Sequence, residues 1–368
     1  MKKLLSILLT LAMAAALLTG CSPDEPESPE PPADAPSGGD PPASISPLYI
    51  SVISKGFQHQ FWQAVKAGSD QAGVDLGIDV YFNVPDGEAA IADQVDMFIA
   101  ELAKNPAALA LAALDTSSVL PQLQDAFNRG IPVIGFDSGV PDAPAGQVAA
   151  NVSTNNAAAA ALGATHMFPE ISSKIAAATY DNPVVIAVLS QDATSESITG
   201  RTRGFAAEMA SLAGGVNDSV AITGGFSAIN TGDANAAVRI EVVVGATPDV
   251  VDMTNAANAV LLTSNLAGVF CSNEGAVSGL LAAIDAGSAV PGGTVLVGFD
   301  AGEAQKAAVR SGLFFGSVTQ DYFQIGYQAV RLAVEAARGN SVSDVDAGAQ
   351  WWDSSNMNNA DIALLLYD

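Results

Sequence analysis

The chain has 368 residues, of which 39 are acidic and 14 are basic, so its formal net charge at pH 7 is −25. A charge of this sign and size argues against nucleic acids and other polyanions as partners, because the protein would repel them. The sequence has two histidines and no HExxH, CxxC, Walker A or GxSxG motif, so we expect no enzyme activity, cofactor or metal, with a dispersed active site as the alternative.

The N-terminal segment is typical of a signal peptide, expected over residues 1–20. Lys2 and Lys3 precede an apolar run over 4–18, which is shorter than the roughly 18 residues of a membrane span. The following Leu-Thr-Gly-Cys resembles a bacterial lipobox, which implies that Cys21 is lipidated. The alternative is an ordinary signal peptide with a coincidental cysteine. Lipidation of Cys21 would leave Cys271 without a disulfide partner, and we expect Cys271 to be a small core residue.

Residues 21–47 are rich in Pro, Ser, Asp and Glu and contain almost nothing apolar. Such a segment cannot bury enough surface to fold. We therefore expect a disordered, Pro-rich tether that holds the folded part away from the membrane, with folding starting near Leu48. The remaining length suffices for two domains.

From Leu48 onward, strand-like and helix-like segments alternate, which favours βαβ units and two three-layer α/β lobes. The expected strands are 49–53, 80–82, 108–113 and 133–136 in a first set, and 184–189, 220–223, 269–271, 295–299 and 315–318 in a second. The expected helices are 61–76, 89–104, 120–129, 155–167, 199–212, 256–263, 275–286, 303–311 and 322–338.

Two expected strands end in the same way: residues 133–137 and 295–300 each place Gly-Phe-Asp after an apolar run. Ligands of open α/β sheets collect outside the carboxyl ends of parallel strands. The pattern therefore predicts two similar lobes that direct Asp137 and Asp300 at one crevice. The alternative is that each Asp caps the next helix.

Other strand ends carry aromatic and hydrogen-bonding residues. Phe61 and Trp62 cannot both point squarely into one core, because adjacent helix positions differ by about 100°. One of them is expected to face a sugar ring, unless both pack in the core. Arg201 offers a planar fork of donors. Asn273 both donates and accepts, with helix capping as its alternative role.

These residues together resemble the periplasmic-binding-protein family of sugar receptors of ABC importers, of the ribose-binding type, over nearly all of 48–368. The resemblance implies two Rossmann-like lobes with parallel sheets, joined by a three-strand hinge, which is the type I periplasmic binding protein fold. It implies a pocket lined by Ser54, His59, Phe61, Trp62, Asp137, Ser138, Arg201, Phe226, Asn273, Asp300 and Gln320. Two positions depart from the ribose-type pattern: Ser138 replaces an Arg and His59 replaces an Asn. The preferred sugar therefore need not be ribose, because a site built around particular hydroxyls rejects ligands that leave its polar groups unpaired.

The resemblance also implies how the chain divides. Residues 48–152 with 322–350 are expected in the N-terminal lobe, and 153–321 with 351–368 in the C-terminal lobe. Hinges are expected near 151–154, 320–321 and 349–352.

The expected protein is a monomeric lipoprotein on the outer face of the bacterial cell membrane, or in the periplasm of a host with two membranes. It touches the membrane only through its anchor. It binds a monosaccharide between the lobes and delivers it to an ABC permease. The alternatives are a receptor that feeds a membrane signalling protein, and a furanosyl signal or a nucleoside as the ligand.

Overall fold

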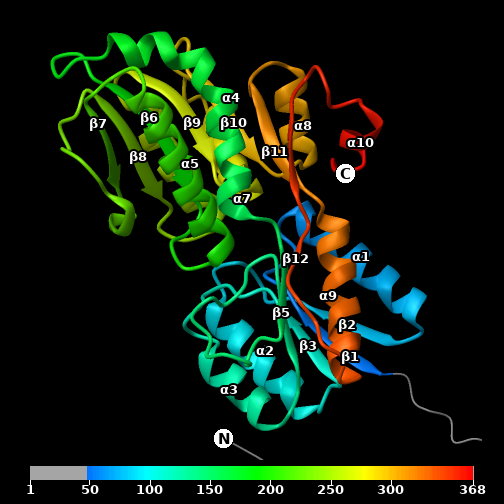
Figure 1. Cartoon of the computed structure of the whole chain (residues 1–368). Coiled ribbons are helices and arrows are strands. Elements are labelled where there is room, and N and C mark those ends of the chain that lie inside the picture. Colours follow the sequence, from blue (N-terminus) through cyan, green and yellow to red (C-terminus); the bar gives the residue numbers. More distant parts are fainter. Residues whose placement is uncertain (1–47, 368) are drawn as a thin grey trace, which may run out of the picture. The chain divides into compact units, whose positions relative to one another are not determined.

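Short apolar runs of the chain form the strands of two sheets, each covered by helices on both faces (Figure 1). The computed structural model describes residues 48–367. The expected α/β architecture with two three-layer lobes is confirmed. The predicted leader, Cys21 and the tether lie outside the described residues. Within the described part, no helix has the length and apolar character needed to cross a membrane.

The first sheet has six parallel strands in the order β12-β5-β4-β3-β1-β2. Its strands are β1 (Tyr49–Ile53), β2 (Asp79–Asn83), β3 (Ala108–Leu111), β4 (Val133–Phe136), β5 (Ala150–Ser153) and β12 (Val345–Asp346). Helices α1 (Gln60–Leu76) and α9 (Tyr322–Ala337) pack on one face, and α2 (Ile91–Ala103) and α3 (Leu120–Asn128) on the other. Because both faces are covered, β3 and β4 are buried along their whole length.

The second sheet has seven strands in the order β13-β11-β10-β9-β6-β8-β7, of which only β13 is antiparallel to its neighbour. Its strands are β6 (Val184–Ser190), β7 (Val220–Gly224), β8 (Val238–Val244), β9 (Leu266–Cys271), β10 (Val295–Phe299), β11 (Gly316–Gln320) and β13 (Ala349–Trp352). Helices α4 (Asn156–Ala177) and α5 (Glu196–Gly214) cover one face. Helices α6 (Val250–Leu261), α7 (Glu274–Asp285) and α8 (Glu303–Arg310) cover the other, and the short helices are η1 (Ser227–Ile229) and α10 (Ala360–Ala363).

The structure departs from the expected elements. Strand β8 was not among the expected strands, although it is one of the longest strands in the sheet. Helix α4 continues through Pro169 to Ala177 instead of ending at 167. Pro169 removes one helical hydrogen bond, but Ile171 and Ile175 beyond it are fully buried against the sheet, and this burial offsets the loss. Cys271 is fully buried, as expected.

The chain passes between the two sheets three times, over 153–156, 320–322 and 346–349. The three crossings meet at Thr154, whose hydroxyl lies 2.9 Å from Gln320 Oε1 and 3.2 Å from the Gly348 carbonyl oxygen. The third expected hinge, 349–352, is wrong because these residues form β13, which pairs along its length with β11. Ala349 and Gln350 therefore belong to the second sheet rather than to the first lobe.

Candidate functional site

The two Gly-Phe-Asp segments end β4 and β10, as the sequence predicts. Asp137 and Asp300 are each 3% exposed, with φ angles of 53° and 76°. Asp is one of the few residues that visits this left-handed region, because its short polar side chain bonds locally. Asp300 does not cap the helix that follows, since α8 has Gly302 as its N-cap.

Both aspartates line one small cavity between the lobes, with a volume of about 20 Å³. Eight of the expected site residues line it: His59, Phe61, Trp62, Asp137, Arg201, Asn273, Asp300 and Gln320. These residues come from strand ends and helix starts of both sheets. The two lobes thus face each other through side chains that donate and accept hydrogen bonds.

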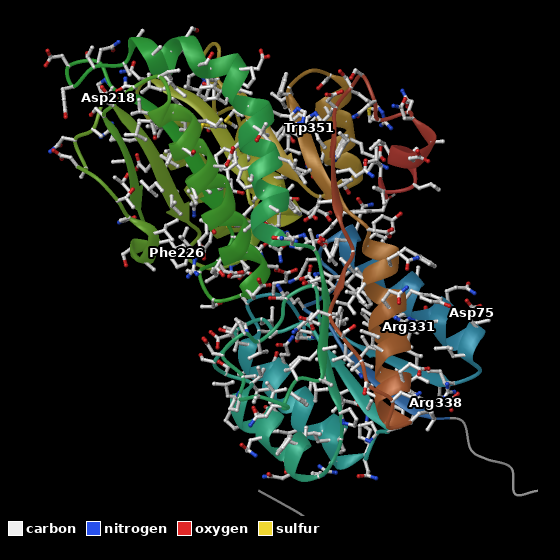
Figure 2. The ribbon with its side chains drawn as sticks, viewed as in Figure 1. Asp75, Asp218, Phe226, Arg331, Arg338 and Trp351 are labelled. Carbon is white, nitrogen blue, oxygen red and sulfur yellow. The ribbon has the colours of Figure 1, made fainter. Side chains whose placement is uncertain are left out.

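Three expected site residues do not line the cavity. Ser54 is fully buried, and its hydroxyl has no hydrogen-bond partner. The Ser138 hydroxyl accepts from Ser197 N at 3.3 Å and thus lies one step behind the cavity wall. Figure 2 shows Phe226 on the loop after β7, and its ring lies 5.0 Å from the Arg203 guanidinium. Phe226 was expected in the pocket from the resemblance to the ribose-binding type, but it follows β7, the edge strand of the second sheet, and does not line the cavity.

Five lining residues were missed in the sequence: Lys55, Glu88, Ser197, Ile198 and Glu274. Lys55 and Glu274 each follow an expected site residue directly, and Lys55 is a basic residue in a chain with few of them. Glu88 lies on the loop between β2 and α2 and carries no comparable signal.

Arg201 occupies the centre of the site between the two aspartates. Its Nη2 lies 3.7 Å from Asp137 Oδ1, and its Nη1 lies 3.8 Å from Asp300 Oδ2. Its Nε donates to Asn156 Oδ1 at 2.9 Å, and its guanidinium stacks 3.9 Å above the Phe299 ring. The contacts with Asn156, Asp300 and Phe299 lie within the second lobe and hold the guanidinium fork in place before a ligand arrives.

The aromatic pair at the start of α1 is nearly buried and still reaches the cavity. Phe61 and Trp62 pack edge to face, with ring centroids 5.0 Å apart. The Trp62 indole donates to Glu88 Oε1 at 2.7 Å. Both rings therefore pack in the lobe and line the cavity at once, so the two alternatives considered for them are not exclusive.

Asn273 likewise has two roles. Its Oδ1 accepts from Ala276 N at 3.0 Å and caps α7, while its Nδ2 donates to Gln191 Oε1 at 2.7 Å. The helix cap fixes the side chain that lines the cavity.

Two glutamates bond across the cleft. Glu274, at the start of α7, accepts from the backbone N–H groups of Gln60 and Phe61 at 3.1 Å each. A carboxylate at the N-terminus of α1 is favoured by the helix dipole. Glu88 of the first lobe accepts from Gln191 Nε2 of the second at 2.6 Å. These contacts hold the lobes closed over the cavity.

Two carboxyl groups that line the cavity have pKa values shifted in opposite directions. Burial raises the pKa of Asp300 to about 6, while Arg201 lowers it and Glu274 raises it further. Burial also disfavours the charged form of Glu88, but His59 and Lys55 outweigh it and hold its pKa below the usual range. Glu88, Asp137, Glu274 and Asp300 are four acidic groups of the lining, against the two basic groups of Lys55 and Arg201 and the imidazole of His59, which is charged only when protonated.

The described residues contain no group of three or more His, Cys, Asp or Glu side chains suited to hold a metal ion. The lining residues are instead hydrogen-bonding groups and aromatic rings, a combination that binds a polar small molecule.

Known proteins resemble this chain over most of its length. The model of the family described as "Periplasmic binding protein domain" matches residues 50–341. The D-allose-binding periplasmic protein of Escherichia coli K12 is 21% identical over 308 residues, which cover 82% of this chain and 88% of that protein.

Solved structures share the two-lobed fold. One, described as an ABC transporter, LacI family transcriptional regulator from Brachyspira murdochii, is 39% identical with a TM-score of 0.73, covering 88% of this chain and 99% of that one. An ABC transporter solute-binding protein from Agrobacterium vitis with bound D-fucose is 26% identical with a TM-score of 0.72, covering 87% of this chain and 100% of that one. The chain therefore belongs to the periplasmic binding protein family, with the type I fold, and is a solute-binding protein rather than an enzyme.

Proposed function

We propose that this protein is a lipid-anchored receptor outside the cytoplasm that binds a neutral monosaccharide between its lobes and delivers it to an ABC permease. The observation that carries the proposal is the position of Arg201 between Asp137 and Asp300, beside the rings of Phe61 and Trp62. Carboxylates accept from sugar hydroxyls, the guanidinium donates to sugar oxygens, and aromatic faces pack on C–H groups of the ring.

The charge of the cavity supports a neutral ligand. Four acidic and two basic groups line it, and the whole chain is strongly acidic. A sugar phosphate or a sugar acid would meet net repulsion there. The names of two relatives agree with a neutral sugar, since one binds D-allose and another was solved with D-fucose.

Binding of a sugar requires movement. A cavity of about 20 Å³ is close to the space that one water molecule needs, which is on the order of 10–15 Å³. A sugar ring must therefore enter while the lobes are apart, and the three crossings at Thr154, Gln320 and Gly348 are the natural hinge. The contacts of Glu274 and Glu88 across the cleft favour the approach of the lobes toward the closed arrangement.

A thermal-shift screen of the chain from Ser22 onward tests the proposal. The panel holds D-allose, D-fucose, D-ribose, other pentoses and hexoses, inositols, nucleosides and furanosyl signalling compounds. A ligand at about a thousand times its Kd adds roughly 4 kcal/mol to the free energy of unfolding, and the midpoint should rise by several degrees.

Two neighbouring arginines provide the matched variants. Arg201→Met should abolish the shift, whereas Arg203→Met should keep it, because Arg203 is exposed and lies over Phe226. If only nucleosides or only furanosyl compounds raise the thermal midpoint, the ligand belongs to that class and not to the monosaccharides proposed here. No shift across the panel would contradict the proposed function.

A further inference from the structure

A second, larger cavity lies beside the one described above. It has a volume of about 570 Å³ and is lined by Gln58, His59, Pro248, Asp249, Val250, Val251, Asp252, Gly275 and Ser278. Pockets that bind small molecules usually measure about 300–1,000 Å³. This larger cavity, here called the outer cavity, therefore has the size of a ligand site in the closed structure, whereas the inner cavity described above, at about 20 Å³, needs the lobes to separate before it can take a ring.

His59 belongs to both cavities. A Cβ atom at Gly275 would come within 3.0 Å of His59 Nε2 and would collide with Gln191 Oε1. The absence of a side chain at Gly275 thus leaves room for the imidazole at the boundary between the cavities. The His59 side chain therefore lies at the boundary between the two cavities.

The walls of the outer cavity combine apolar and polar surface. Val250 and Val251 are 55% and 67% exposed, which is unusual for valine. Gln58, Ser278 and Asp249 supply the polar groups of the wall. The Asp249 carboxylate makes no capping hydrogen bond to α6. A sugar ring has both an apolar C–H face and a hydroxyl edge, so it matches this mixture, whereas Asp249 and Asp252 disfavour an anionic group.

We propose that the outer cavity binds a second ring, joined by a glycosidic bond to the sugar in the inner cavity, so that the ligand is a glycoside of at least two rings. The inference rests on the proposed function and specifies its substrate class. His59 is the residue that the glycosidic link passes, and its imidazole turns aside to let the two rings connect.

Isothermal titration calorimetry on the chain from Ser22 onward tests this inference. The probes are the monosaccharide that gives the largest thermal shift, its methyl α- and β-glycosides, and its 4-nitrophenyl α- and β-glycosides. The nitrophenyl ring probes the outer cavity. We expect one nitrophenyl anomer to bind about tenfold or more tightly than the matching methyl glycoside, because its ring covers the valine surface.

Variants that fill the outer cavity separate the two sites. Ser278→Trp and Val251→Trp should remove the advantage of the nitrophenyl glycoside and leave the affinity for the free monosaccharide unchanged. Ala282→Trp is the matched control, since it lies one turn further along α7 and does not line the cavity.

The outcomes distinguish this inference from the proposed function. If the free sugar binds but no nitrophenyl glycoside binds more tightly than the matching methyl glycoside, the second-ring site is overturned and the receptor function stands. The same holds if both tryptophan variants keep the full advantage. If no sugar binds at all, both the function and the second-ring site fail.

Discussion

Asp137 and Asp300 share a sequence, a strand end and a left-handed backbone, but they are held in different ways. Asp137 faces Ser197 and Arg201 across the cleft, at 3.4 and 3.7 Å, and Lys55 of its own lobe at 3.5 Å. Asp300 accepts from Glu274 N and Gln320 Nε2, both at 3.0 Å, and both come from the second sheet or the helix after it.

The contacts of the Asp137 carboxylate therefore depend on closure of the lobes, whereas the strongest contacts of the Asp300 carboxylate do not. The strongest contacts of Asp300 persist when the lobes separate, because they lie within one lobe. Two of the three contacts of Asp137 form only when the lobes meet. We infer that the second lobe presents a prepared half-site, and that the first lobe completes it on closure.

The largest effect is expected from removing either carboxylate. Asp137→Ala and Asp300→Ala should each weaken sugar binding by about 2–5 kcal/mol, because each leaves a buried charged partner unpaired. Titration calorimetry measures the affinity, with Phe226→Ala as a control that binds like the unchanged protein. Affinity retained in both aspartate variants would show that these carboxylates are structural and would remove the basis of the comparison.

The stability of the unliganded protein should separate the two aspartates next. The pKa of the Asp300 carboxyl rises from 3.8 to about 6 on folding, so the folded state binds its proton more tightly. Its contribution to the free energy of unfolding is therefore greatest below pH 4 and falls by about 3 kcal/mol in total as the pH rises through 6. Asp300→Asn cannot titrate and should become more stable than the unchanged protein across this window.

Thermal midpoints at pH 4, 5, 6 and 7 check this prediction. Asp137→Asn is the contrasting variant and should lower the midpoint at pH 7, because Lys55 is buried and loses its carboxylate partner. Parallel curves for Asp300→Asn and the unchanged protein would contradict the assigned role of Asp300.

A smaller effect is expected at Glu274, which links the two half-sites. Its backbone N–H donates to Asp300, and its carboxylate accepts from the start of α1 in the other lobe. Glu274→Gln keeps the size but removes the charge at the helix N-terminus, which should weaken binding by about 1 kcal/mol. Small-angle scattering with ligand present should show a larger radius of gyration.

Glu303→Gln is the control for this variant, since Glu303 begins α8 at an exposed position. Unchanged affinity and scattering in Glu274→Gln would mean that the lobes close without this contact.

The sequence was most informative where side chains follow from a single strand. Asp137 and Asp300 come directly after a buried apolar run, and Asn273 comes one residue later; such a run predicts at which end of the sheet the side chains after it lie. Phe226 was assigned to the pocket by resemblance and does not line the cavity, because strand order decides whether a strand end lies near the cleft. That order depends on β8, which was not among the expected strands.

Contacts between distant segments were not predictable in this way. Glu88 bonds to Gln191, which is 103 positions away. Gln191 directly follows the buried strand β6, but Glu88 stands in no local pattern. The third hinge was expected at 349–352, whereas the chain crosses between the sheets at 346–349. The expectation failed because the pairing of β13 with β11 joins residues far apart in the chain. Pairing of this kind depends on the assembled sheet rather than on the periodicity of a segment.

Cys271 has a practical consequence for following the motion of the lobes. In the chain from Ser22 onward it is the only cysteine, its side chain is fully buried, and burial raises the pKa of its thiol well above the usual range. Such a thiol does not react with maleimide dyes. New cysteines at the exposed positions Tyr81 and Val216, one in each lobe, can then be labelled selectively. The native protein is thus ready for conversion into a fluorescent sensor that reports its ligand by energy transfer.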